Sequence, residues 1–474
     1  MRAVSMSKSL IMRMFALGLP SLAATAPALA QPVEVPPTWG GDFWSRTRAT
    51  GSWGGVRDEL GKKGVVFDAD LLLTPQDVVS GGRSTGAEFW GNADLTLNID
   101  TGKLGLWPGG FFKLSSDSGF GTNAYSNSGA IVPVNSAALI PAPNDRTTAL
   151  MNATFMQFLS TKFGLFLGKI NTLDLAKQEF YGDYSTQFQN TAFLTPMTLQ
   201  QVPLSAFGGG VIGLPTEDII LSVVALDPSG TPTSNDLGNA FKDGAMAVGS
   251  GQVTIKPFGL VGHQSLGFSW SDKERLSLNQ DRTNIARFLL TEKFPRLGNP
   301  GPILERILAR FFPGLLVPVQ PANRTSRTWS ANYSFDQYFW QPEGDSKHGM
   351  GAFFEFGASD GNPNPIKYAF IVGIGGKGML PSRGDDSFGI AFAHTKFSSE
   401  FLPFLRQRLD LGLEHENAVE MYYNASITKS LSATGDLQIV DSALNKTLVE
   451  SSVRPSLTNV STAVVLGLRL RARF

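Results

Sequence analysis

The last residues of the chain alternate between apolar and polar positions. In VVLGLRLRARF (464–474), every even position is apolar, and Arg469, Arg471 and Arg473 stand at odd positions. A period of two residues predicts a β-strand with one apolar face and one polar face. Taken alone, this segment fits an amphipathic strand of a soluble β-sandwich as well as a strand of a membrane barrel.

The same alternation recurs along most of the chain, for example in ADLTLNID (93–100), WSANYSFDQYF (329–339) and VEMYYNASI (419–427). The polar faces carry full charges and amides, which suit a water-filled lumen, and aromatic residues gather near strand ends, as membrane girdles require. The pattern therefore predicts an all-β transmembrane antiparallel β-barrel. Such a barrel must be closed, because an open edge in lipid would leave backbone groups unpaired. A soluble barrel or sandwich is the alternative.

We expect about 16 strands, and an even number places both ends of the chain on the periplasmic side. The strands are predicted near residues 65–74, 89–100, 111–117, 151–160, 164–170, 208–215, 219–227, 244–257, 262–272, 327–340, 349–359, 366–376, 387–397, 416–427, 431–440 and 462–474. Connections on the periplasmic side are then short. The long external connections are 118–150, 171–207, 273–326, 398–415 and 441–461. A barrel of about this size leaves an aqueous channel in its centre.

The beginning of the chain reads as a secretory signal peptide. Arg2, Lys8 and Arg13 precede a short apolar stretch, and Ala28 to Ala30 form an A-x-A cleavage site. Further on, WGGVRDELGKKG (53–64) predicts a short helix before the first strand. The expected division of the chain is a signal peptide at 1–30, an N-terminal periplasmic segment with a short helix at 31–64, and the barrel at 65–474.

Composition supports a chain that partly faces lipid. Only 17% of the residues are charged, although the chain holds 34 Phe and 51 Gly. Removing the three bases of the leader from 40 Lys and Arg leaves 37 against 40 Asp and Glu, so no nucleic-acid partner is expected. There is no cysteine, which excludes disulfides and thiolate metal sites. No run of 18 apolar residues follows the leader, so no membrane-spanning helix is predicted.

Signals of an enzyme are weak. The four histidines show no metal-binding spacing, and the two G-x-G-x-x-G matches at 208–213 and 373–378 lack a βαβ context. His263 and Ser265 share one strand face, but two residues alone do not support an outer-membrane lipase. We therefore predict no catalytic residue, no metal site and no cofactor.

Several segments resemble the carbohydrate-selective porins of the OprB type. They are GSWGGVRDELGKKGVVFDADLL, LTLNIDTGKLGLWPGGFF, GKINTLDLAKQEFYGDYSTQFQNTAF, YSFDQYFW, DDSFGIAFAHTKFS, EMYYNASITKSLSATGDLQIV and VLGLRLRARF, in this order along the chain. The resemblance implies a bacterial outer-membrane porin through which carbohydrates diffuse passively and selectively. A general or anion-preferring porin on the same barrel is the alternative. The insertion 281–322, where ILERILARFF predicts a loop helix, has no counterpart in the resemblance.

The connection from Asn171 to Pro203 is too long for a simple hairpin. In porins the corresponding loop folds inward and narrows the lumen, so the resemblance implies that this segment forms the constriction. Sugar recognition needs hydrogen-bonding groups and aromatic faces, and rapid flux favours weak sites. The candidates for constriction and sugar contact are Asp174, Lys177, Glu179, Tyr181, Gln187, Phe188 and Asn190, with Asp183 beside them. An ordinary solvated surface loop is the alternative.

The arginines of the last strand are expected to face the lumen, and Arg469 is a further candidate pore residue. Arg471 and Arg473 are expected to lie at the periplasmic rim and to solvate it. Phe474 resembles the aromatic signal of outer-membrane assembly, although Ala472 stands where a second aromatic is usual. The expected partners are transported sugars, outer-membrane lipid and the barrel-assembly machinery, and the sequence leaves a homo-oligomer open.

Overall fold

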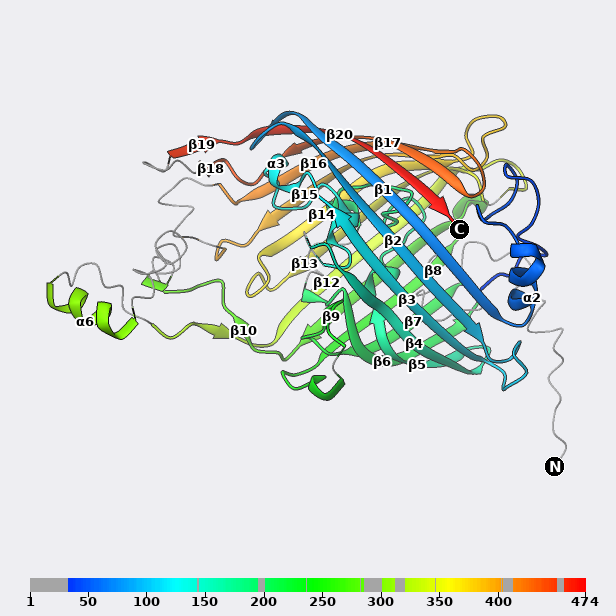
Figure 1. Cartoon of the computed structure of the whole chain (residues 1–474), viewed down its shortest axis with the longest axis horizontal. Helices are drawn as coiled ribbons and strands as arrows, with labels where there is room; N and C mark the ends of the chain where they lie inside the picture. The colour runs from blue at the N-terminus through cyan, green and yellow to red at the C-terminus, as the bar shows by residue number, and fades with distance from the viewer. Residues whose placement is uncertain are drawn as a thin grey trace.

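A closed barrel of 16 antiparallel strands forms almost the whole molecule (Figure 1). This computed structural model describes residues 33–142, 145–194, 201–235, 237–281, 283–284, 301–311, 320–345, 347–401, 403, 412–449 and 456–474. The predicted fold class and strand number are confirmed. The predicted signal peptide at 1–30 lies outside the described residues, and the division of the chain stays a prediction.

Each barrel strand pairs with its neighbour along the chain, and the last strand closes on the first. The strands are β1 (Val65–Gly82), β2 (Gly86–Asp100), β3 (Gly110–Gly121), β4 (Thr148–Ser160), β5 (Phe163–Asn171), β6 (Ser205–Thr216), β7 (Ile219–Leu226), β8 (Met246–Ile255), β9 (Gly262–Ser271), β12 (Thr328–Trp340), β13 (Gly349–Ser359), β14 (Ile366–Lys377), β15 (Ser387–Phe397), β16 (His415–Ser426), β17 (Leu431–Asp441) and β20 (Ser461–Arg473). Every predicted strand corresponds to one of them.

Short elements occupy the connections. They are η1 (Trp53–Gly55), α2 (Val56–Lys62), α3 (Tyr125–Ser128), η2 (Ser136–Leu139), η3 (Thr172–Leu175), η4 (Thr191–Phe193), η6 (Leu237–Asn239), η7 (Pro257–Gly259), α6 (Gly301–Phe311) and the two-stranded ribbons β10 (Arg275–Leu276) with β11 (Arg324–Thr325) and β18 (Lys446–Val449) with β19 (Ser456–Asn459). Among the described residues, none of the helices has the length and apolar character needed to cross a membrane.

The alternation of the sequence separates an outer face from an inner face on each strand. In β20, Leu466, Leu468 and Leu470 point outward and are 48%, 44% and 40% exposed. Val465 and Arg469 point inward and are 0% and 1% exposed. Side chains of a strand alternate between its two faces, so the register of β20 places all three leucines toward lipid and Arg469 toward the lumen.

The two ends of the barrel differ in the length of their connections (Figure 1). The helix α2 and the end of β20 lie at the end with the short turns, which is the end predicted as periplasmic. The ribbons β10–β11 and β18–β19 and the helix α6 project from the opposite end. Both the short helix before β1 and the loop helix in the insertion are therefore present, as predicted.

The seam between β1 and β20 is held at the end with the short turns by the N-terminal segment. Arg57 of α2 is buried and donates hydrogen bonds to the Asp68 carboxylate at 2.8 Å and to the Phe474 carbonyl at 3.0 Å. Its guanidinium lies 5.2 Å from the ring of Trp39 and 4.9 Å from that of Trp53. One cation therefore contacts both strands of the seam.

Candidate functional site

The β5–β6 loop, described over 172–194 and 201–204, lies against the inner wall of the barrel. Arg469 of β20 donates to the Tyr184 carbonyl at 2.9 Å and to the Gln187 carbonyl at 2.7 Å, and it also reaches the Thr434 hydroxyl at 3.0 Å. The side chain of Asn190 accepts a hydrogen bond from the backbone N–H of Ala192 and so caps the short helix η4. Arginine and asparagine therefore fix the loop at two of its turns.

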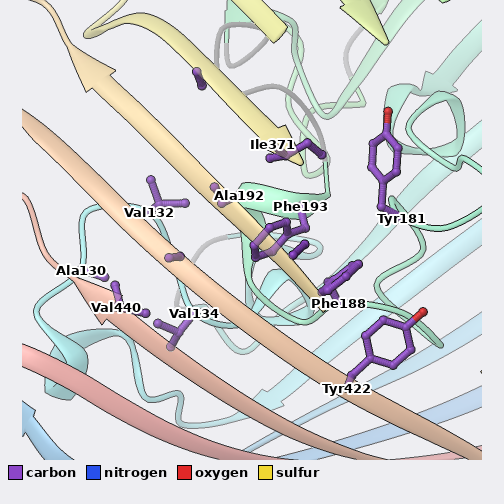
Figure 2. Close-up of a cluster of buried hydrophobic side chains, with 14 of the residues drawn as sticks. Ala130, Val132, Val134, Tyr181, Phe188, Ala192, Phe193, Ile371, Tyr422 and Val440 are labelled. Carbon is purple, nitrogen blue, oxygen red and sulfur yellow. The ribbon is translucent and has the colours of Figure 1, made fainter. Parts of the chain in front are cut away.

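Aromatic side chains pack the same loop onto the wall formed by β12 to β16 (Figure 2). The ring of Phe188 lies 4.8 Å from that of Tyr422 and 4.7 Å from that of Phe193. Tyr181 stacks on Phe353 at 4.9 Å. All five side chains are buried, so this half of the lumen holds a hydrophobic core in place of water.

The β3–β4 loop, described over 122–142 and 145–147, also folds into the lumen. Trp90 donates from Nε1 to the Ala137 carbonyl at 3.1 Å, and Asn92 donates to the Ile140 carbonyl at 2.9 Å. We predicted the segment 118–150 only as an external connection. Its sequence of small and apolar residues gives no sign of an inward path, because the side chains that bind it belong to other segments of the chain, such as β2 and β17.

The two loops contact each other inside the barrel. The backbone N–H and the hydroxyl of Ser136 donate to the Gln189 carbonyl at 2.7 and 2.8 Å. The N–H of Thr191 donates to the Pro133 carbonyl at 2.9 Å. Figure 2 shows residues of both loops, among them Val132, Val134 and Phe193, converging on the same strands. A barrel with two joined loops in its lumen is built to restrict passage.

The sequence model of the family described as carbohydrate-selective porin, OprB family, matches residues 85–474. The chain belongs to this family. It is a porin of the bacterial outer membrane that is selective for carbohydrates, which confirms the predicted function and location. Its family and fold are those of channels rather than of enzymes.

Solved structures carry the same fold. A high-pH structure of OprB from Pseudomonas putida is 20% identical to this porin, with a TM-score of 0.70, and the match covers 92% of this chain and 100% of that one. A low-pH structure of the same protein is 16% identical, with a TM-score of 0.53 and coverages of 91% and 99%. At these identities the likeness shows the fold alone. A comparison with curated proteins found no match.

Four of the candidate residues are buried in this porin. Tyr181, Phe188, Asn190 and Arg469 are each at most 2% exposed, and their contacts are with the loop and the wall. They determine where the β5–β6 loop lies. Sugar contact by the candidate set stays a prediction.

The other four candidates are partly accessible and also have partners. Asp174 is 19% exposed and pairs with Lys113 of β3 at 2.6 Å, and Lys177 is 41% exposed and lies 3.7 Å from Asp183. Gln187 bonds to the backbone of the same loop. These side chains are among the described loop positions that solvent in the lumen can reach.

Two loop carboxyls differ in their tendency to ionise. Burial raises the pKa of Glu179, and the hydrogen bond from the Tyr338 hydroxyl at 2.6 Å offsets this only in part. Burial also works to raise the pKa of Asp183, but Lys177 and Arg471 lower it below its ordinary value. Asp183 is therefore a fixed negative charge at neutral pH, balanced by its two cations.

The last arginines of the porin differ in their surroundings. Arg471 pairs with Asp70 of β1 and is 20% exposed, and the backbone N–H of Arg473 donates to the Ser430 carbonyl in the turn after β16.

Within the described part of the chain, no three His, Asp or Glu side chains are grouped so that they could hold a metal ion.

Proposed function

We propose that sugars cross this porin between the accessible side chains of the β5–β6 loop and the inner wall formed by β7, β8 and β9. The observation that carries the proposal is the chemistry of that wall. Ser250 is exposed, and Gln252, Thr254 and Ser265 are partly exposed, at positions that alternate with outward residues such as Leu266. Hydroxyl and amide groups at this spacing offer both donors and acceptors to a neutral solute.

The electrostatics of the wall suit an uncharged solute. The inward positions of β7, β8 and β9, all within the described residues, carry no ionisable side chain except His263, and Asp336 binds that histidine at 2.7 Å. A neutral wall neither attracts nor repels ions, so it adds hydrogen bonding for sugars without a preference for charge. On the loop, Asp174, Lys177 and Glu179 offer sugars stronger hydrogen-bonding groups that are more widely spaced than those of the wall.

The proposal is tested by liposome swelling with a series of sugars, together with single-channel ion current. Replacing Asp174, Lys177 and Glu179 together by alanine is expected to change sugar permeation relative to ion current. The barrel should keep its heat-modifiable migration on gels, because no strand is altered. A matched control replaces Glu305, Arg306 and Arg310 of α6, three charged residues on the projecting insertion. Equal behaviour of the two triple variants would place the sugar path elsewhere.

The inner wall has its own test. Replacing Gln252 by leucine and Ser250 by alanine removes hydrogen-bonding groups but introduces no charge. Sugar-driven swelling should fall, while the ion current stays within about a factor of two. If charged and neutral solutes of one size slow down equally, the barrel acts as a general porin at this wall.

Contacts outside the lumen belong to the same proposal. The outward leucines of β20 are suited to lipid, and Phe474 is the candidate contact for the barrel-assembly machinery. The backbone N–H of Phe474 donates to the Ala69 carbonyl at 2.7 Å, so the same residue also completes the pairing of β20 with β1.

A further inference from the structure

Strand β16 carries two inward carboxylates that bind loop backbone. Glu416 is 4% exposed, and its two oxygens accept hydrogen bonds from the N–H groups of Ile131 and Val132, each at 2.8 Å. The N–H of Ala443, after β17, donates to the same carboxylate at 3.1 Å. Glu416 thus holds the β3–β4 loop by two successive peptide groups.

Glu420 repeats this arrangement on the other loop. It is 0% exposed, and its two oxygens accept from the N–H groups of Gln189 and Asn190, the latter at 2.9 Å. The side-chain amide of Asn190 donates to Gln438 of β17 at 3.1 Å. Glu416 and Glu420 are four residues apart on one strand, so both side chains point to the same side of the wall.

The chemistry of these contacts requires a carboxylate. Two neighbouring N–H groups that converge on one side chain need two acceptor oxygens, and the two oxygens of a glutamate side chain supply both. Glutamine has one acceptor and one donor, so its NH₂ group would meet one of the loop N–H groups without forming a bond.

Hydrogen bonds between the two loops connect the peptide groups held by Glu416 with those held by Glu420. Ser136 bonds to the Gln189 carbonyl, directly beside the peptide groups that Glu420 holds. Thr191 bonds to the Pro133 carbonyl, next to the residues that Glu416 holds. A loop that loses its own carboxylate therefore stays attached through its neighbour.

We propose that Glu416 and Glu420 are the positioning residues of the constriction, and that they hold the two inward loops on β16 as a single unit. The selectivity of the pore then depends on both carboxylates, although neither touches the solute. The part of this inference that concerns selectivity rests on the proposed sugar path, whereas the anchoring itself does not.

Thiol labelling measures the anchoring directly. The natural chain has no cysteine, so a cysteine placed at Thr191 or at Ala138, 3% and 4% exposed, is the sole labelling site. E416Q or E420Q alone should raise the labelling rate at either site by less than about threefold, because the other anchor remains. The double variant should raise both rates by about tenfold or more, which exceeds the product of the single effects. Effects that simply multiply, or that each stay on one loop, would overturn the proposal.

Aspartate variants separate the carboxyl group from its reach. E416D and E420D keep a carboxyl group on the wall, but the side chain is one methylene too short to reach the two loop N–H groups. They should therefore label like the glutamine variants, and heat-modifiable migration verifies that each barrel is folded. Wild-type labelling in the double aspartate variant would overturn the proposal, because a carboxyl group that cannot reach the loop would then suffice.

Sugar swelling on the same variants reports on function. The double variants should discriminate less between small and large sugars than wild type, and each single variant should stay close to wild type. If labelling rises but sugar discrimination is unchanged, the anchoring stands and the proposed sugar path is wrong. If labelling itself is unchanged, the loops are held by other contacts and the inference fails.

Discussion

Replacing Arg469 by methionine should detach one edge of the β5–β6 loop while leaving the barrel closed. The side chain is 1% exposed, and two of its hydrogen bonds, at 2.9 and 2.7 Å, go to loop carbonyls. A hydrogen bond to a charged group contributes about 1.5–3 kcal/mol, so losing both lowers the local opening free energy of the loop by about 3–6 kcal/mol. This is an upper bound, because lumen water can solvate the freed carbonyls.

The assay is the labelling rate of a cysteine at Thr186, between the two carbonyls that Arg469 holds, combined with sugar swelling. Arg469→Met should raise labelling several-fold at this edge of the loop, whereas a cysteine at Thr191, beside the Glu420 anchor, should respond less. Arg469→Lys should be intermediate, because an ammonium keeps the charge but lacks the fork that spans two carbonyls. Arg471→Met is the matched control, since Arg471 is a cation on the same face that pairs with Asp70 and affects the loop only through the charge of Asp183. If Arg469→Met and Arg471→Met label equally, the loop is not held in the way that the contacts indicate.

Three further predictions concern the barrel itself. Leu468→Lys should reduce the yield of folded barrel, because a lysine near the bilayer midplane on the lipid face costs about 2–4 kcal/mol. Ser250→Lys, on the lumen face, should fold normally. If heat-modifiability gels show the reverse order, the lipid and lumen faces are assigned the wrong way round. Deleting Phe474 should lower the amount of folded barrel in the outer membrane, and normal insertion would dismiss its role in assembly. Arg57→Met should lower the temperature at which the barrel unfolds on gels, because the seam loses a cation that donates hydrogen bonds to both of its strands. An unchanged unfolding temperature would show that these hydrogen bonds of Arg57 are dispensable.

The strands were predictable because each one repeats a local rule. A period of two appears in the sequence wherever one face meets lipid, as in Leu466, Leu468 and Leu470 of β20. The pattern needs no knowledge of distant residues, so the strand count and the order of long and short connections could be read directly. Lipid contact imposes this regularity on every strand of the barrel.

The interior was less predictable because its contacts join residues far apart in the chain. The segment around Val132 and Pro133 reads as a plain connection, and its inward path depends on distant side chains such as Glu416, more than two hundred residues later. The sequence predicts Tyr181 and Phe188 as sugar contacts because aromatic residues suit sugar rings. The structure shows that they also pack on Phe353 and on the wall, since an inward loop needs a core of its own.

The contacts of the inward loops also constrain the order in which the molecule can form. Glu416, Glu420 and Arg469 belong to the last strands of the barrel, and they are separated from their loop partners by 285, 231 and 282 residues. The loops therefore cannot reach their final positions until the chain has been laid down almost to its last strand. Both loops join strands at the open external end of the barrel, so they can enter the lumen either while the sheet curls or after β20 has paired with β1. In either order, we expect the constriction to be the last part of the molecule to form.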